Sequence, residues 1–594
     1  MESPSYSEIQ ETLHNAQTDG LPKLVVTVLR NIMLEPIEPY LSHLAYTNGF
    51  APEIRFGQFD NILQEASNAA SDLWSTAPDV ILVFSKLEAL SPAIAFRFSS
   101  LSPEEVKAEL DRVGHFVDST LASLREHTQA TILWHGFETP VNPALGIYDG
   151  QVEHGQSNSI RRLNDALRHS LSATKTAYYV DLDRCVAQLG ADKFYDPRYW
   201  HIGRAPYSRE ALRTIADENW KFVRASKGLV KKCLVLDCDN VLWGGIVGED
   251  GLKGIRLSQD YPGSPFYEFQ QEVLSLYKRG VIIALCSKNN EGDVWEVFRD
   301  FPDMVLKEEH IATAQINWDD KPTNIQRIAA DLNIGLDSLV FMDDSDFEVA
   351  FVRDALPEVT VIHLPPERAV RNRDVLAGCG LFDTVTLSDE DRRRGAMYKA
   401  EARRKKLKAT TDPRTYLKSL GMEVDVRFVD ETALPRVAQL TQRTNQFNLT
   451  TKRYSEADVS SIASNPNGDV LYLRLKDSLG DYGIVGMAVL RHETSHSEID
   501  TFLMSCRVIG RGVEDVFLTA CLETAMKKGA PNVLGKYIKT KKNGLVADFY
   551  RRNGFEIIDE TAETVEYAYA LSQPLPATPE YMHAVKFEEL EQLT

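Results

Sequence analysis

Short apolar segments recur along this chain, and stretches long enough to form a helix separate them. The first four lie at 24–30, 80–85, 131–134 and 177–181. Apolar runs of this length that alternate with helical stretches are typical of open parallel sheets covered by helices. Residues from about 20 to 225 are therefore predicted to form one α/β domain.

A second series of apolar runs begins abruptly after Lys232 with CLVLDCDN and continues at 280–286, 338–342 and 359–363. This pattern again predicts a doubly wound α/β domain. From about residue 415 an amphipathic helix and alternating strands indicate a third α/β domain. Because 594 residues are too many for one hydrophobic core, several domains are expected. The predicted boundaries are 1–225, 226–387, a basic connector helix at 388–414, 415–575, and a C-terminal tail at 576–594.

The composition limits the classes of partner. A formal charge of −20 opposes nucleic-acid binding, which usually needs a dominant basic face. The longest apolar runs are far shorter than the roughly 20 residues of a membrane-spanning helix, and residues 1–20 lack the pattern of a secretory signal. Seven scattered cysteines show no metal-binding spacing. We therefore expect a cytoplasmic protein with reduced thiols that binds neither nucleic acid nor membrane.

The strongest chemical signal is a pair of carboxylates, Asp237 and Asp239, at the end of the apolar run LVL. Strand ends of this kind open into the ligand crevice of an α/β sheet. One carboxylate can attack phosphorus to give an aspartyl phosphate, and its neighbour can protonate the leaving group and then activate water. We predict Asp237 as the nucleophile and Asp239 as the acid and base.

Three further elements follow in order along the chain. Ser287 ends the next apolar run and offers a hydroxyl to a phosphate oxygen, and Lys321 supplies a positive charge. Asp343 and Asp344 end another run, and carboxylates are the hard oxygen ligands that magnesium prefers. Each element alone is equally compatible with an ordinary acidic turn. Together they predict a phosphotransferase whose Mg²⁺ ligands are Asp237, Asp239, Asp343 and Asp344.

These motifs resemble those of the haloacid dehalogenase superfamily, and the stretch from Lys232 to about Leu387 resembles the FkbH-like subfamily, whose first motif reads DxDNTLWGG. Val241 stands where that subfamily usually has threonine. The resemblance implies an enzyme that dephosphorylates 1,3-bisphosphoglycerate and loads the glyceryl unit as a thioester on an acyl carrier protein for polyketide-type biosynthesis. A stand-alone phosphatase and a non-enzymatic carrier-docking scaffold are the alternatives.

Glyceryl loading needs a thiol, and two cysteines are candidates. Cys238 lies inside the phosphate motif, although alternation along a strand points it away from Asp237 and Asp239 and favours a buried core residue. Cys506 closes an apolar run just before a glycine-bearing turn. A thiol there is placed to face a thioester site.

That turn and its surroundings, from about 420 to 570, resemble the N-acetyltransferase-like fold. The resemblance implies that the turn binds the pyrophosphate of coenzyme A or the phosphopantetheine arm of a carrier protein. A structural helix cap without a ligand is the alternative reading. The predicted cofactor-binding residues are Arg507, Gly510, Arg511, Gly512 and Asn543.

The N-terminal domain, with DPRYWHIGRAPYS at 196–208, resembles the degenerate SGNH-hydrolase-like domain of longer family members. Residues 27–33 lack the Gly-Asp-Ser nucleophile of active esterases, so hydrolysis by this domain is not expected. His201 is either a remnant of an active site or a surface residue. The connector at 388–414 is rich in arginine and lysine, which predicts either a solvated helix face or a docking surface for an acidic carrier protein.

Overall fold

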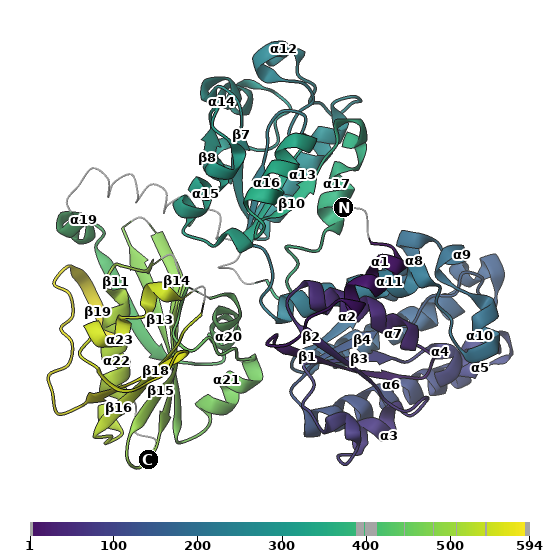
Figure 1. Ribbon diagram of the computed structural model, residues 1–594. Coiled ribbons are helices and arrows are strands. Elements are labelled where there is room, and N and C mark those ends of the chain that lie inside the picture. The colour runs from purple at the N-terminus through teal and green to yellow at the C-terminus, as the bar shows by residue number, and fades with distance from the viewer. Residues whose placement is uncertain are drawn as a thin grey trace. The chain divides into compact units, whose positions relative to one another are not determined.

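The computed structural model describes residues 4–387, 397, 413–444, 446–478, 480–505, 508–540 and 543–587. The chain divides into two compact units, Glu2–Lys227 and Gly228–Thr594, and the second unit contains two separate sheets (Figure 1). The sequence places the first boundary at residue 225. No helix in the described part of the chain is long and apolar enough to span a membrane.

The N-terminal unit is built on a parallel sheet with the strand order β2-β1-β3-β4-β5. Its strands are β1 (Lys23–Arg30), β2 (Ala51–Phe56), β3 (Val80–Phe84), β4 (Thr131–His135) and β5 (Ala177–Val180). Its helices are α1 (Tyr6–His14), α2 (Glu38–Thr47), α3 (Ile62–Ser67), α4 (Leu87–Leu90), α5 (Pro92–Phe96), α6 (Pro103–His127), α7 (Gln156–Ala173), α8 (Leu182–Leu189), α9 (Ala191–Phe194), α10 (Pro197–Gly203) and α11 (Arg209–Ser226).

Helices cover both faces of this sheet because its inner strands are apolar on both sides. Leu82 of β3 packs in the core formed with α2 and α11, whereas its neighbours Ile81 and Val83 pack in the core formed with α6 and α7. This alternation follows from the two-residue repeat of a strand. A continuous apolar run in the sequence therefore indicates a strand that is buried on both faces.

The central sheet is also entirely parallel, with the strand order β10-β9-β6-β7-β8. The strands are β6 (Cys233–Leu236), β7 (Ile282–Ser287), β8 (Ile311–Ile316), β9 (Leu339–Asp343) and β10 (Thr360–His363). The helices are α12 (Val247–Gly254), α13 (Ser264–Lys278), α14 (Glu291–Asp300), α15 (Lys321–Leu332), α16 (Asp346–Ala355) and α17 (Asn372–Gly378). Both parallel sheets confirm the predicted doubly wound α/β class.

The C-terminal sheet is mixed, with the strand order β17-β18-β16-β15-β14-β13-β11-β19 and with β12 paired to β15. Its strands are β11 (Met422–Phe428), β12 (Phe447–Asn448), β13 (Gly468–Asp477), β14 (Gly480–His492), β15 (Ser497–Met504), β16 (Asn532–Ile538), β17 (Glu556–Glu560), β18 (Thr564–Ala570) and β19 (Met582–Phe587). Its helices are α19 (Pro413–Ser419), α20 (Leu434–Arg443), α21 (Glu456–Ala463), α22 (Val513–Lys527) and α23 (Phe549–Arg552).

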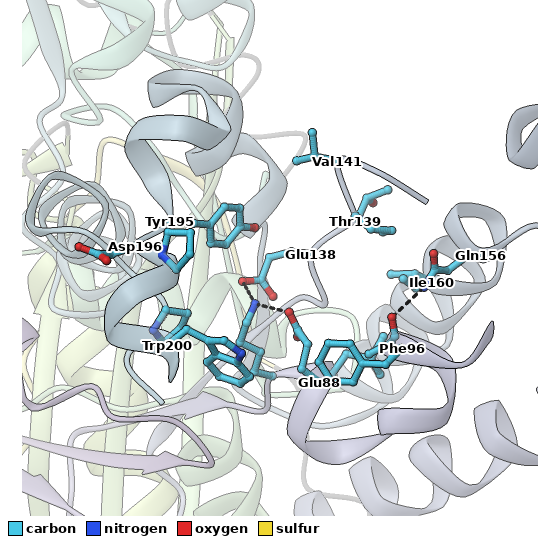
Figure 2. A pocket seen from close by; sticks show the side chains of 16 residues that line it. Glu88, Phe96, Glu138, Thr139, Val141, Gln156, Ile160, Tyr195, Asp196 and Trp200 are labelled. Atoms are coloured by element: carbon cyan, nitrogen blue, oxygen red, sulfur yellow. Dashed lines mark hydrogen bonds and ion pairs between the residues drawn. The ribbon is translucent and has the colours of Figure 1, made fainter. Parts of the chain in front are cut away.

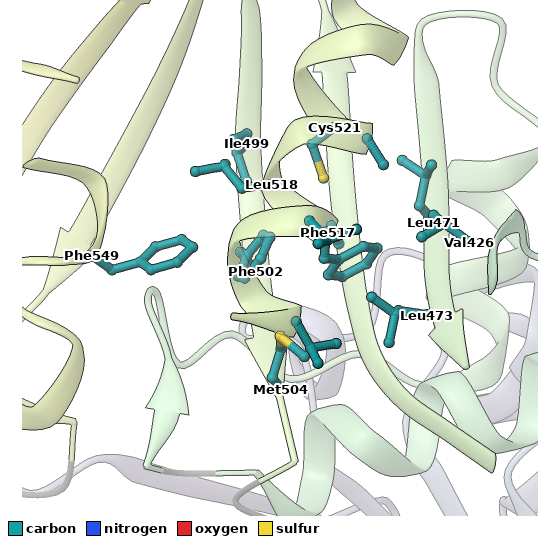
Figure 3. Packing of buried hydrophobic residues seen from close by; sticks show 14 of the residues in the cluster. Val426, Leu471, Leu473, Ile499, Phe502, Met504, Phe517, Leu518, Cys521 and Phe549 are labelled. Carbon is teal, nitrogen blue, oxygen red and sulfur yellow. The ribbon is translucent and has the colours of Figure 1, made fainter. Parts of the chain in front are cut away.

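The helix α22 is the centre of the C-terminal core. Phe517 and Cys521 of α22 are fully buried among strand residues such as Phe502 (Figure 3). The parallel strands β15 and β16 pair only through Ser497–Ile499 and Val533–Gly535. The segment predicted as a C-terminal tail contains β19, which pairs in parallel with β11 and adds an edge strand to this sheet.

Candidate active site

The predicted catalytic carboxylates meet where the central sheet reverses its strand order. The chain winds from β6 through β7 to β8 on one side and through β9 to β10 on the other, so the reversal lies between β6 and β9. Ligands of doubly wound sheets bind outside the strand ends at such a point. Asp237 follows β6, and its N–H donates to Met342 O at 3.0 Å, which holds it beside the end of β9.

The turn after β6 is fixed by its own backbone. Asn240 has a φ of 55° and Gly245 a φ of 99°, and the Asn240 Oδ1 accepts the N–H of Gly245 at 2.9 Å. Asparagine and glycine tolerate such left-handed conformations. Val241 is fully buried in the hydrophobic core. Val241 therefore contributes to packing here.

Lys321 joins two of the carboxylates. It is the first residue of α15, which is capped by Asp320 through the N–H of Thr323 at 2.9 Å. Its ammonium lies 2.6 Å from Asp237 Oδ1 and 3.1 Å from Asp343 Oδ2. Burial lowers the pKa of Lys321, but the charges of Asp237 and Asp343 outweigh burial and raise the pKa overall. The side chain is therefore a buried, fixed positive charge.

Three carboxylates form a group suited to a cation. Oxygen atoms of Asp237, Asp343 and Asp344 all lie within 4.8 Å of one another. Burial, followed by the negative charge of Asp237, raises the pKa of both Asp343 and Asp344 to about 6. Asp343 Oδ2 is buried and forms an ion pair with Lys321. Among the described residues, no hydrogen bond to this oxygen is found.

These observations fit a bound divalent cation. Carboxylate oxygens are the ligands that Mg²⁺ prefers, and the excess of negative charge that raises two pKa values is what a cation would neutralise. Asp237, Asp343 and Asp344 would hold the ion.

Asp239 does not belong to this group, so its predicted role as a metal ligand through the carboxylate is corrected. Its Oδ1 accepts from Trp243 Nε1 at 2.8 Å and from Val247 N at 3.1 Å. Its Oδ2 accepts from Asn289 Nδ2 at 2.9 Å. Burial raises the pKa of Asp239, and the charge of Asp237 adds to this effect. A raised pKa suits the predicted role as proton donor and acceptor.

Sequence reasoning missed Asn289, which links two predicted site residues. Its Nδ2 also lies 3.1 Å from Ser287 Oγ, so one amide group orients both Asp239 and Ser287. Ser287 ends β7 and is 1% exposed. The signal was present in the sequence, because Asn289 stands only two residues after the serine at the same strand end.

The structure argues against Cys238 as a catalytic thiol. Its side chain is fully buried in the hydrophobic core. Burial, followed by the charge of Asp237, raises the pKa of Cys238 well above that of an ordinary thiol. Only the thiolate is nucleophilic, so Cys238 is a core residue. Cys506 lies outside the described residues.

The glycine turn before α22 differs from an open phosphate cradle. Gly512 has a φ of 73°, and a Cβ there would lie 2.4 Å from the hydroxyl of Tyr581. The N–H of Gly510 donates to Glu514 Oε1 at 3.2 Å, and Asp515 adds a second carboxylate to the first turn of α22. A phosphate bound at this turn would have to displace Glu514 and Tyr581.

Two other predicted cofactor residues have partners within the protein. Arg511 is 5% exposed, and its Nη1 donates to Tyr482 Oη at 2.5 Å. Asn543 is fully buried, and its Nδ2 donates to Asn448 O and Ile538 O at 2.9 Å each. Its Oδ1 accepts the N–H of Thr540 at 2.9 Å. The hydrogen bonds of Asn543 within the protein indicate a structural role. Arg507 and the connector residues 388–396 and 398–412 lie outside the described residues.

The N-terminal domain is predicted to lack an esterase nucleophile at residues 27–33. Its His201 is exposed to solvent. His201 lies in α10, and its exposure favours the interpretation that it is a surface residue.

Comparisons with known proteins find a family model and solved structures that are similar to parts of this chain. Residues 40–223 match the family model described as FkbH, N-terminal domain. The chain is also similar to the crystal structure of the N-terminal part of the protein BF1531 from Bacteroides fragilis, which contains a phosphatase domain complexed with Mg. That match has a TM-score of 0.60 and 29% identity, and it covers 65% of this chain and 100% of the other.

Acetyltransferase structures match a smaller part of the chain. The ribosomal-protein-S18-alanine N-acetyltransferase from Escherichia coli is 14% identical, with a TM-score of 0.21, and the match covers 25% of this chain and 96% of the other. An acetyltransferase from Salmonella typhimurium is 17% identical, also with a TM-score of 0.21, over 25% of this chain and 95% of the other. No curated protein matches the chain.

Proposed function

We propose that the central domain is a Mg²⁺-dependent phosphohydrolase that forms an aspartyl phosphate on Asp237. The observation that carries this proposal is the arrangement of Lys321 between Asp237 and Asp343 at the strand-order reversal. The similarity to a phosphatase domain crystallised with Mg supports it. Bound Mg²⁺ would supply positive charge next to the transferring phosphoryl group.

Each step can be assigned to side chains of this protein. A carboxylate oxygen of Asp237 attacks phosphorus, and the bond between phosphorus and the leaving oxygen breaks. Asp239 gives its proton to that oxygen, and Lys321 holds the Asp237 carboxylate through the contact at 2.6 Å. The ionised Asp239 then takes a proton from water, whose oxygen attacks phosphorus and releases Asp237 and inorganic phosphate.

The finer proposal is that the substrate is 1,3-bisphosphoglycerate and that the glyceryl unit is loaded on an acyl carrier protein. A thiol sulfur would attack the acyl carbon and expel phosphate, which conserves the acyl group as a thioester. The remaining phosphate ester would be hydrolysed at Asp237. The FkbH-type match of residues 40–223 supports this choice. Between β6 and β7 the chain forms the helices α12 and α13 rather than an inserted cap domain, which supports a large, carrier-bound substrate.

The Asp237→Asn variant tests the catalytic assignment. An amide is close in size to a carboxylate but does not attack phosphorus, so the rate of p-nitrophenyl phosphate hydrolysis should fall by about 1,000-fold or more. Asp300→Asn is the matched control because Asp300 is exposed at the end of α14, and it should leave the rate unchanged. Phosphate release by Asp237→Asn at the wild-type rate would exclude Asp237 as the nucleophile.

Intact mass spectrometry separates the finer proposal from its alternatives. Wild-type enzyme incubated with 1,3-bisphosphoglycerate and a carrier protein should add a glyceryl mass to the carrier. A stand-alone phosphatase would release phosphate and leave the carrier mass unchanged. A non-enzymatic docking scaffold would do neither.

A further inference from the structure

The N-terminal domain contains a cavity that the proposed phosphatase chemistry does not use. It has a volume of about 290 Å³, and its lining residues Lys86 and Glu138 follow the carboxyl ends of β3 and β4. Figure 2 shows the side chains that line it. The strand order of this sheet reverses between β1 and β3, so the cavity borders the place where α/β sheets bind ligands. All residues that line it belong to the N-terminal unit.

A buried cluster of charges forms one wall of this cavity. The Lys86 ammonium lies 3.0 Å from Glu138 Oε1 and 3.2 Å from Glu88 Oε1, as the dashed lines in Figure 2 show. The hydroxyl of Tyr207 also donates to Glu138 Oε1 at 2.7 Å. The side chains of Lys86 and Glu138 are only 5% and 6% exposed. Burial alone lowers the pKa of Lys86, but the two carboxylates outweigh it and the net shift is upward.

Carboxylates outnumber cations at this wall. Glu88, Glu138 and Asp196 line the cavity, and Lys86 is the lining cation. Glu88 and Glu138 face Lys86, whereas the carboxylate of Asp196 points away from them (Figure 2) and accepts the N–H of Tyr199 at 3.2 Å. The positive charge of Lys86 is already matched by two carboxylates, so the local potential opposes an anionic ligand and favours a cation.

The remaining walls are largely aromatic and apolar. Phe96 is 64% exposed and Val141 63% exposed, and Trp200 and Tyr195 line the cavity opposite them (Figure 2). Aromatic faces attract cations within about 6 Å. The contact of Arg204 with Trp200 shows that this ring accepts such a partner.

The lining of this cavity offers no esterase-type nucleophile. Its lining residues include no serine or cysteine. The hydroxyl of Thr139 is engaged, because it donates to Asp183 Oδ2 at 2.7 Å.

We propose that this cavity binds a small organic cation, an amine whose ammonium group faces Glu88 and Glu138 and whose apolar body packs between Phe96 and Trp200. This binding site is independent of the phosphatase site in the central domain. Its ligand class is distinct from phosphorylated acids, which the carboxylates of the wall would repel.

Three probes of nearly equal size test the charge preference on the full-length protein. Benzylamine is a cation at neutral pH, benzyl alcohol is neutral, and benzoate is an anion. Ligand-observed NMR titration should give a Kd of about 1 mM for benzylamine, as expected for so small a ligand. Benzyl alcohol should bind more weakly, and benzoate should bind most weakly. Benzoate binding as tightly as benzylamine, or no benzylamine binding, would overturn the proposal.

Two variants locate the binding in the cavity. Glu88→Gln keeps the size of a side chain that is 29% exposed, and it should weaken benzylamine binding by about threefold to tenfold. Phe96→Ala removes an exposed ring without opening the core, and it should weaken binding by about twofold to fivefold. Glu153→Gln is the control because this glutamate is 75% exposed and pairs with Arg162. Unchanged affinity in both cavity variants would place the site elsewhere and refute the proposal.

Discussion

Lys321 is the residue on which the electrostatics of the candidate active site depend. Its ammonium is 3% exposed and lies between Asp237 and Asp343. A buried charge without a partner is strongly unfavourable, so removal of this ammonium leaves two buried carboxylates without their counter-charge. Asp237, Asp343 and Asp344 together carry more negative charge than the single Lys321 can neutralise. A bound Mg²⁺ would supply the missing positive charge.

The Lys321→Met variant tests this account. Without Mg²⁺ the central domain should lose about 3 kcal/mol of stability, because the carboxylates then repel one another. Saturating Mg²⁺ should restore part of this loss. Hydrogen exchange of the β6 and β9 amides measures both effects. Lys278→Met, at an exposed position of α13, should change protection by less than about 0.5 kcal/mol. Equal protection of Lys321→Met and wild type without Mg²⁺ would contradict the account.

The pH dependence of Mg²⁺ binding follows from Asp343 and Asp344. Burial and the charge of Asp237 raise the pKa of both groups from 3.8 to about 6. Below pH 6 protons compete with the metal, so the Kd for Mg²⁺ should rise by about tenfold or more per pH unit. Calorimetric titration at pH 5, 6 and 7.5 measures this change. A Kd that is constant over this range would contradict the raised pKa values.

The same shifts set the sign of the stability change in the metal-free protein. Between pH 3.8 and about 6 the folded protein binds more protons at these carboxyls than the unfolded chain does. The free energy of unfolding should therefore decrease as pH rises through this window when Mg²⁺ is absent.

At the scale of elements, the inner strands were predictable and two edge strands were not. The apolar runs at 80–85 and 338–342 correspond to β3 and β9, which are buried on both faces. The sequence analysis missed β2 and β8, which lie at sheet edges and are only partly buried. Residues of β2 are half-buried throughout and those of β8 in its middle, so neither strand presents a continuous apolar run.

In the candidate site too, some features could be predicted from the sequence and others could not. Asp237, Ser287 and Asp343 were predictable because each lies at the end of a recognisable apolar strand. The orientation of Asp239 toward Asn289 could not be predicted. It depends on a turn whose geometry is set by backbone angles and by long-range hydrogen bonds. The hydrogen bond from Asn543 to Asn448 O could not be predicted either, because the two residues are 95 positions apart in the sequence.

Asn543 connects the segment after β16 to β12, and its replacement tests this structural role. Asn543→Ala removes the hydrogen bonds to Asn448 O and Ile538 O and leaves buried carbonyl groups unpaired. The C-terminal domain should lose about 2 to 3 kcal/mol, seen as a lower midpoint of its thermal transition in calorimetry. Asn465→Ala is the control because Asn465 is exposed. An unchanged midpoint for Asn543→Ala would return this residue to the candidates for ligand binding.

At the scale of the whole molecule, the chain forms two compact units, and the phosphatase-type residues all belong to one of them. The N-terminal unit ends at Lys227, whereas Asp237, Lys321 and Asp344 lie in Gly228–Thr594. The organic-cation cavity lies entirely in the N-terminal unit. The two proposed activities are therefore built on separate hydrophobic cores, and each should survive the removal of the other.

Separation of the two units gives the last prediction. A fragment that begins at Gly228 keeps every hydrogen bond and ion pair described for the candidate active site. Because domains with their own cores generally fold alone, this fragment should hydrolyse p-nitrophenyl phosphate within about threefold of the full-length rate and with the same Mg²⁺ requirement. The fragment carrying Asp237→Asn is the control for contaminating phosphatases. A folded fragment, with native circular dichroism, that lacks activity would mean that the N-terminal unit contributes to catalysis.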